Sequence, residues 1–158
     1  MLREEGGHRE KVSVAGAVWL SPQRDRIGLI FQTVVNAYFN NQRSALFLER
    51  LMREIPNRMV VIWDGGPMHK GDPIRAQVEK FRPRLCLERL PPYAPILNPV
   101  EPIWSWLKYS RLCNFAAHDA RELNRAIVAQ LARIEDDQET LRNLWHATDL
   151  PFPRTLLS

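Results

Sequence analysis

Two runs of β-forming residues near the start of the chain are separated by a short polar turn. Residues 11–20 alternate apolar side chains up to Ser21-Pro22, and residues 27–35 are rich in branched apolar side chains. Runs of this kind, bounded by polar turn residues and proline, are typical of strands. The two runs therefore predict an antiparallel hairpin.

Apolar residues at helical spacing mark three segments, 42–54, 73–81 and 120–134, and residues 138–147 suggest a last short helix. Apolar positions three and four apart place one apolar face along a helix. The positions that this pattern assigns to the core are Leu46, Phe47, Leu51, Met52, Ile74, Val78, Phe81, Leu123, Ile127, Leu131 and Ile134.

A continuous apolar run over residues 59–63 ends directly at Asp64, which is followed by two glycines and a proline. An uninterrupted apolar run predicts a strand buried on both faces. An acid at the carboxyl end of such a strand is a common place for chemistry in α/β folds. The alternative is an ordinary turn residue, because Asp-Gly is strong turn chemistry.

Residues 84–90 predict one further short strand. The resulting order of strands and helices indicates a mixed α/β fold with an antiparallel hairpin at one edge. The 158 residues suit one domain. We expect an irregular segment over 1–10, the α/β domain over 11–135, and a helix with an irregular tail, including Pro151-Phe152-Pro153, over 136–158.

The stretch from Leu90 to Lys108 predicts a stiff, proline-rich loop that leads into a helix. Asn98 is placed to cap the helix, and Glu101 follows three residues later, so a capping box is one interpretation of this acid. The other interpretation is that the helix delivers the carboxylate of Glu101 to a site shared with Asp64. The expected apolar face consists of Val100, Ile103, Trp104 and Leu107, with Glu101, Ser105 and Lys108 opposite and Trp106 off the stripe. Tyr93 is expected to order the loop, and contact with DNA is its alternative role.

Composition and charge narrow the class of protein. The net charge of +4 permits binding to nucleic acid without requiring it. Cys86 and Cys113 form no C-x-x-C pair, so we expect two reduced cysteines in the core rather than a zinc site. The chain contains no apolar stretch long enough to cross a membrane and no signal-peptide pattern, which predicts a cytoplasmic protein.

Two motifs resemble the DDE transposases of the mariner superfamily, most closely the bacterial insertion-sequence branch. They read WDGGPMHKG at 63–71 and LPPYAPILNPVEPIWSWLK at 90–108. The resemblance implies an RNase H-like mixed sheet flanked by helices, and metal-dependent cleavage and transfer of DNA strands. Asp64 and Glu101 match the second and third catalytic acids of the family, and are thereby implied to bind Mg²⁺ or Mn²⁺.

The resemblance also implies roles for neighbouring residues. His69 matches a histidine of the family motif and is expected to support the metal site or face DNA. Lys70, Lys108 and Arg111 are candidates for contacts with DNA phosphates. For each of these four side chains the alternative is ordinary solvation at the surface.

The chain departs from the family pattern at the first catalytic acid. The family carries that Asp on the central strand, upstream of the hairpin, whereas the only Asp before Asp64 here is Asp25, in the predicted turn. We therefore expect a catalytic-domain fragment without its first central strand, inactive alone. An upstream transposase polypeptide, joined by frameshifting, would supply the first Asp and a helix-turn-helix region. The alternative origin is a decayed remnant.

Three other functions remain open on the sequence. The first is a non-catalytic remnant that binds DNA or interacts with a transposase. The second is an RNase H-like nuclease unrelated to transposition, and the third is a structural protein. For the complete transposase, the resemblance implies homo-oligomers that bind transposon ends and target DNA.

Overall fold

The computed structural model of the protein describes residues 10–151. Its elements, in chain order, are β1 (Val12–Leu20), β2 (Ile27–Val35), α1 (Asn41–Glu54), β3 (Met59–Trp63), η1 (Pro67–His69), α2 (Asp72–Lys80), β4 (Leu85–Arg89), η2 (Pro95–Leu97), α3 (Glu101–Trp106), η3 (Leu107–Arg111), α4 (Ala120–Ile134) and α5 (Gln138–Trp145). The sequence-based boundaries agree with most of these to within one or two residues. Residues 1–9 and 152–158, including most of both expected irregular ends, lie outside the described part.

The antiparallel hairpin expected from the alternating pattern is confirmed. β1 pairs with β2 along its whole length, from Leu20 opposite Ile27 to Val12 opposite Val35. The hydroxyl of Ser21 closes the turn, because it accepts hydrogen bonds from the backbone N–H groups of Asp25 and Arg26 at 3.1 and 3.0 Å. The polar turn residues therefore fix the register of the strands.

The second sheet consists of β3 and β4, which run parallel and are connected through α2. The prediction that β3 is buried on both faces is wrong. Met59, Val61 and Trp63 pack towards α1, whereas Val60 and Ile62 on the opposite face are 60% and 61% exposed. The reason is that, within residues 10–151, helices cover only one face of this sheet.

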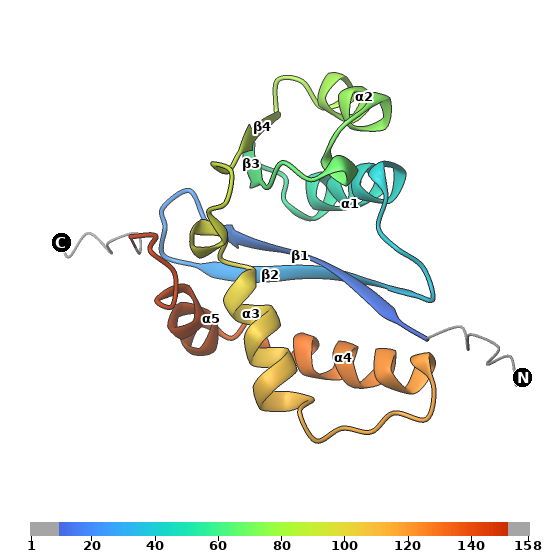
Figure 1. The fold of residues 1–158 in the computed structure, drawn as a ribbon. Coiled ribbons are helices and arrows are strands. Elements are labelled where there is room, and N and C mark those ends of the chain that lie inside the picture. The colour runs from blue at the N-terminus through green and yellow to red at the C-terminus, as the bar shows by residue number, and fades with distance from the viewer. Residues whose placement is uncertain (1–9, 152–158) are drawn as a thin grey trace, which may run out of the picture.

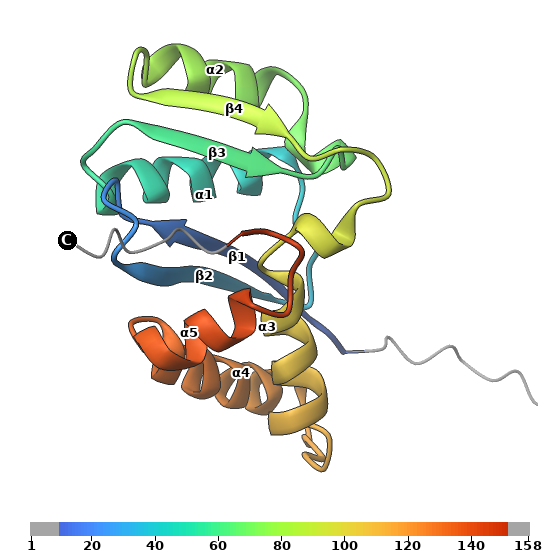
Figure 2. The same ribbon diagram turned by 90° about the vertical axis from the view of Figure 1, so that its left-hand side faces the viewer.

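The strands form two two-stranded sheets, β1 with β2 and β3 with β4, within the expected mixed α/β fold. Both views show the strands in the order β4, β3, β1, β2 (Figures 1 and 2). α1 packs against both sheets, since its buried Ala45 and Leu48 share one apolar cluster with Ala17 of β1 and Val61 of β3. In the described part of the chain, β1 and β3 each pair along one edge only.

A second apolar cluster joins the other face of the hairpin to α3, α4 and α5. Ile27, Ile103, Leu131 and Leu141 are its fully buried members. The side chain of Gln138 ties α5 to β2, because its amide accepts from the N–H of Ile27 and donates to the carbonyl of the same residue. α5 is thus part of the same core as α4.

Three individual burial predictions are wrong. Leu46 lies on the outer face of α1 and is exposed, while the neighbouring Leu48 is buried. Cys86 and Cys113 are both exposed. Cys86 alternates along β4 with Leu85, which is buried, and Leu87, which packs against the apolar cluster of α1. None of the described helices has the length and apolar character needed to cross a membrane.

Candidate active site

Asp64 follows directly after β3, at the carboxyl end of the parallel strands. Its Oδ1 accepts a hydrogen bond from the backbone N–H of Gly66 at 2.8 Å and lies 3.0 Å from Nδ1 of His69. Oδ2 accepts no hydrogen bond from any residue between 10 and 151. The side chain is 61% exposed. One oxygen therefore orients the carboxylate, and the other remains open to a ligand.

His69 is held by its own neighbours. Its ring stacks on the indole of Trp63, with 4.3 Å between ring centroids and 8° between planes, and the side chain is only 18% exposed. Gly66 gives the turn its compactness: a Cβ there would lie 2.9 Å from Oδ1 of Asp64. The turn expected from Asp-Gly is present, and it also fixes a carboxylate.

Glu101 is the first residue of α3, and its side chain is exposed. The capping-box interpretation is wrong. The backbone N–H of Asn98, which a capping box would pair with the carboxylate of Glu101, donates instead to the carbonyl of Pro95 at 2.9 Å. α3 has Val100 at its N-cap position, and Asn98 caps the turn just before it, because its Oδ1 accepts a hydrogen bond from the N–H of Val100 at 3.2 Å. Among the described residues nothing donates to the carboxylate of Glu101, which is free to bind a ligand.

The position of Glu101 is fixed by the packing of α3 on the hairpin. Ile103 and Leu107 are buried, and Trp104 lies against the backbone of β1 at Gly16. A Cβ at Gly16 would come 2.8 Å from Cη2 of the indole. The expected apolar face of α3 is confirmed, because it is this face that contacts the hairpin.

The loop before α3 is not ordered by Tyr93. Its ring is fully exposed, and its φ of 59° lies in the left-handed region. Backbone hydrogen bonds hold the loop instead, from Leu97 to Ala94 and from Asn98 to Pro95 at 3.0 and 2.9 Å. The prolines of the loop add to this stiffness, because each fixes its own φ.

The three expected phosphate-binding residues, Lys70, Lys108 and Arg111, are all exposed at the surface. Lys70 follows the turn that holds His69, and Lys108 and Arg111 lie in the π-helical turn η3, which continues α3. None of the three forms an ion pair with another described residue. The guanidinium of Arg111 lies 5.0 Å from the ring centroid of Trp106.

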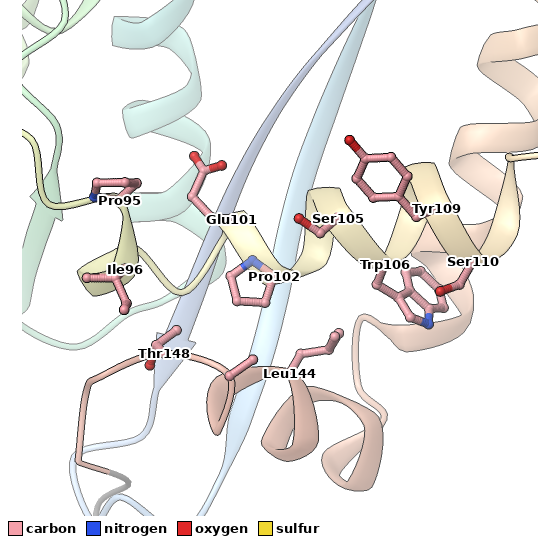
Figure 3. A pocket seen from close by; sticks show the side chains of 11 residues that line it. Pro95, Ile96, Glu101, Pro102, Ser105, Trp106, Tyr109, Ser110, Leu144 and Thr148 are labelled. Atoms are coloured by element: carbon pink, nitrogen blue, oxygen red, sulfur yellow. The ribbon is translucent and has the colours of Figure 1, made fainter.

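A hollow of about 580 Å³ opens beside Glu101, between α3–η3 and the end of α5 (Figure 3). Ser105, Tyr109 and Trp106 line it together with Glu101. The sequence interpretation did not identify this hollow. The only sequence signal was the four-residue spacing of Glu101, Ser105 and Tyr109, which places the three on one face of a helix.

The chemistry of the two acids suits a hard divalent cation. The chain leaves the carboxyl ends of β3 and β4 on the same side of the sheet, where Asp64 follows β3 and the loop after β4 leads to Glu101 (Figure 2). Magnesium binds oxygen ligands and is commonly held by one or two carboxylates, with water and substrate phosphates completing its shell. No group of three His, Cys, Asp or Glu side chains between residues 10 and 151 is placed to hold a metal. A metal bound by two carboxylates would take the rest of its ligands from water and substrate.

Solved structures of one transposase resemble this fold. The catalytic domain of Mos1 mariner transposase has a TM-score of 0.56 and 15% sequence identity, over 89% of this chain and 83% of that chain. A Mos1 transposase paired-end complex with the left transposon end has a TM-score of 0.54 and 15% sequence identity. The match covers 91% of this chain but only 55% of that transposase chain. The likeness confirms the expected α/β fold of the RNase H-like type.

Sequence comparisons add the family. No curated protein sequence matches the chain. Residues 2–134 match the family described as DDE superfamily endonuclease, which covers well over half of the chain. The protein therefore belongs to the DDE superfamily endonucleases.

Proposed function

We propose that the chain is part of an insertion-sequence transposase that cleaves and transfers DNA strands, with Asp64 and Glu101 as ligands of Mg²⁺ or Mn²⁺. The observation that carries the proposal is that the two carboxylates keep oxygens without a partner among the described residues. Glu101 begins a firmly packed helix yet has no partner among residues 10–151, and Asp64 is oriented through one oxygen only. Both carboxylates are exposed, so their unpaired oxygens are free to bind a metal ion.

Each residue then has a definite task. The N–H of Gly66 orients the carboxylate of Asp64, and Nδ1 of His69 lies 3.1 Å from the backbone oxygen and 3.0 Å from Oδ1 of the same residue. The contact of Trp104 with β1 holds the helix that carries Glu101. Lys70, Lys108 and Arg111 would bind DNA phosphates. A bound divalent metal supplies Lewis-acid activation of the attacking oxygen and stabilisation of the leaving oxygen.

DNA binding is tested by its dependence on salt. If three cationic side chains each neutralise one phosphate, the logarithm of affinity should fall with the logarithm of salt with a slope of about −2.7. Affinity would then drop about 40-fold between 50 and 200 mM salt. Replacing Lys108 by Ala should reduce the slope by about 1. A slope near zero would mean that these residues do not bind the DNA backbone.

We also propose that the first acid of the catalytic site lies on a strand from an upstream polypeptide, which pairs with β1 on one side and β3 on the other. Support comes from the two strands themselves, which each pair along one edge and share the packing surface of α1. Glu10 is not a substitute, because its carboxylate accepts a hydrogen bond from the N–H of Ala120 at the start of α4.

The upstream nucleotide sequence, read in three frames, tests this second proposal. It should encode an apolar strand bearing an Asp, preceded by a basic helix-turn-helix region. The fused product should cut DNA carrying the element's ends in Mn²⁺, whereas the chain alone should not. Transposition of a marked element by the purified chain alone would overturn the proposal. We further propose that the fused protein acts as a homo-oligomer.

A second candidate function is a DNA-binding remnant that interacts with an intact transposase. The finding that favours it is the lack of a three-ligand cluster within the described residues. Salt-dependent DNA binding, with no metal-dependent cleavage even after fusion to the upstream product, would support this candidate against the first.

A further inference from the structure

The hollow beside Glu101 has the size of a ligand site. Its volume of about 580 Å³ lies within the range of roughly 300–1,000 Å³ that is usual for small-molecule pockets. One wall is the continuous helical surface of α3 and η3, and the other is the end of α5 with the turn that follows it (Figure 3). Because Glu101 lines the hollow, whatever occupies it lies next to a proposed metal ligand.

The lining combines apolar surfaces with unused hydroxyl groups. Trp106 and Leu144 are apolar members of the lining. Ser105 and Tyr109 point to the same side of the helix as Glu101 (Figure 3). The hydroxyls of Ser105 and Tyr109 make no hydrogen bond with any other described residue, and Tyr109 is 67% exposed. A flat ring with hydrogen-bonding edges suits such a surface, and a nucleobase is a ring of this kind.

Cationic groups lie beside both aromatic rings. The guanidinium of Arg111 is 5.0 Å from the ring of Trp106, and Nζ of Lys108 is 5.1 Å from the ring of Tyr109. Aromatic side chains interleaved with cations are the usual means of binding unpaired nucleotides, since bases stack on the rings and phosphates meet the charges.

We propose that this hollow binds an unpaired nucleobase of the DNA, next to the phosphate that is cleaved, with Tyr109 as its stacking residue. The base must be unpaired because the faces and edges of a paired base are occupied within the duplex. The proposal rests on the proposed function of Asp64 and Glu101, and adds a substrate subsite to it.

The test compares the affinity of two labelled DNAs by fluorescence anisotropy, with Ca²⁺ in place of Mg²⁺. One is a duplex with two unpaired thymidines at one 3′ or 5′ end, and the other is a blunt duplex two base pairs longer. Stacking of one base should make the overhang DNA bind at least about 5-fold more tightly. Tyr109→Ala should abolish this preference, and Tyr109→Trp should retain it.

Tyr38 provides a matched control, because it is 69% exposed and also has a lysine over its ring. Tyr38→Ala should leave the preference for the overhang unchanged. A further variant, Ala147→Trp, would fill the hollow and should remove the preference without touching Tyr109.

Equal affinity of the wild-type chain for the two DNAs would overturn the inference, as would a preference that survives both Tyr109→Ala and Ala147→Trp. If the chain binds Mn²⁺ through Asp64 and Glu101 but shows no preference for unpaired ends, only the subsite is lost. If it binds neither metal nor DNA, the proposed function fails and the subsite fails with it.

Discussion

Replacing Gly16 by Ala should displace α3 and disturb Glu101 from a distance. The added Cβ would lie 2.8 Å from Cη2 and 3.0 Å from Cζ2 of Trp104, and 3.5 Å from Cγ1 of Val100. The indole cannot retreat freely, since Ile103 and Leu107 on the same helix turn are buried. Overpacking of this kind costs about 1–3 kcal/mol.

For a chain of this length, 1 kcal/mol corresponds to about 2–4 °C in Tm, so Gly16→Ala should lower Tm by about 2–12 °C. Thermal unfolding followed by circular dichroism measures this change. Gly65→Ala is the matched control, because a Cβ at Gly65 meets no atom within 4 Å. Its Tm should equal that of the wild-type chain.

A double-mutant cycle locates the effect. Trp104→Leu alone should also destabilise the chain, because it leaves a cavity beside β1. In the double variant with Gly16→Ala, the destabilisation should be smaller than the sum of the two single effects. The difference should correspond to a coupling free energy of about 1 kcal/mol between the two sites. An unchanged Tm for Gly16→Ala, or strictly additive effects in the double variant, would refute the argument that this contact positions the helix.

Three further predictions concern the acids and a helix cap. Gly66→Ala should weaken Mn²⁺ binding, because its Cβ would lie 2.9 Å from Oδ1 of Asp64; an affinity equal to wild type, by electron paramagnetic resonance, would contradict this. His69→Ala should weaken Mn²⁺ binding about 10-fold, the usual effect of losing a group that orients a metal ligand. His69→Asn should bind Mn²⁺ more tightly than His69→Ala but more weakly than the wild-type chain. At the start of α4, the hydrogen bond from the N–H of Glu122 lowers the pKa of Asp119. The stabilisation from this cap should be full above about pH 4 and fade as pH falls through the lowered pKa of the folded state, whereas Asp119→Asn should remove this part of the acid sensitivity in thermal unfolding.

Local sequence patterns predicted the elements well. Ile27–Val35 and Ala120–Ile134 were located to the residue, since polar turns bound the one and Asp119 caps the other. Proline in the loop and apolar spacing likewise indicated a helix at Glu101. In each case the decisive interactions lie within a few residues of one another.

Long-range packing was harder to predict. An apolar run such as 59–63 does not reveal whether one or both faces will be covered, and Val60 and Ile62 are in fact exposed. The capping box at Asn98 failed because its N–H was already used by Pro95, a competition that sequence spacing does not show. The stack of His69 on Trp63 and the hollow beside Glu101 depend on three-dimensional contacts.

The central claim is that Asp64 and Glu101 share a divalent metal site, and Mn²⁺ binding followed by electron paramagnetic resonance tests it most directly. The wild-type chain should bind Mn²⁺, and Asp64→Asn and Glu101→Gln should each weaken binding by about 10-fold or more. Asp136→Asn, an exposed acid between α4 and α5, should leave it unchanged. Equal binding by all four proteins would contradict the claim and leave both acids as ordinary surface residues.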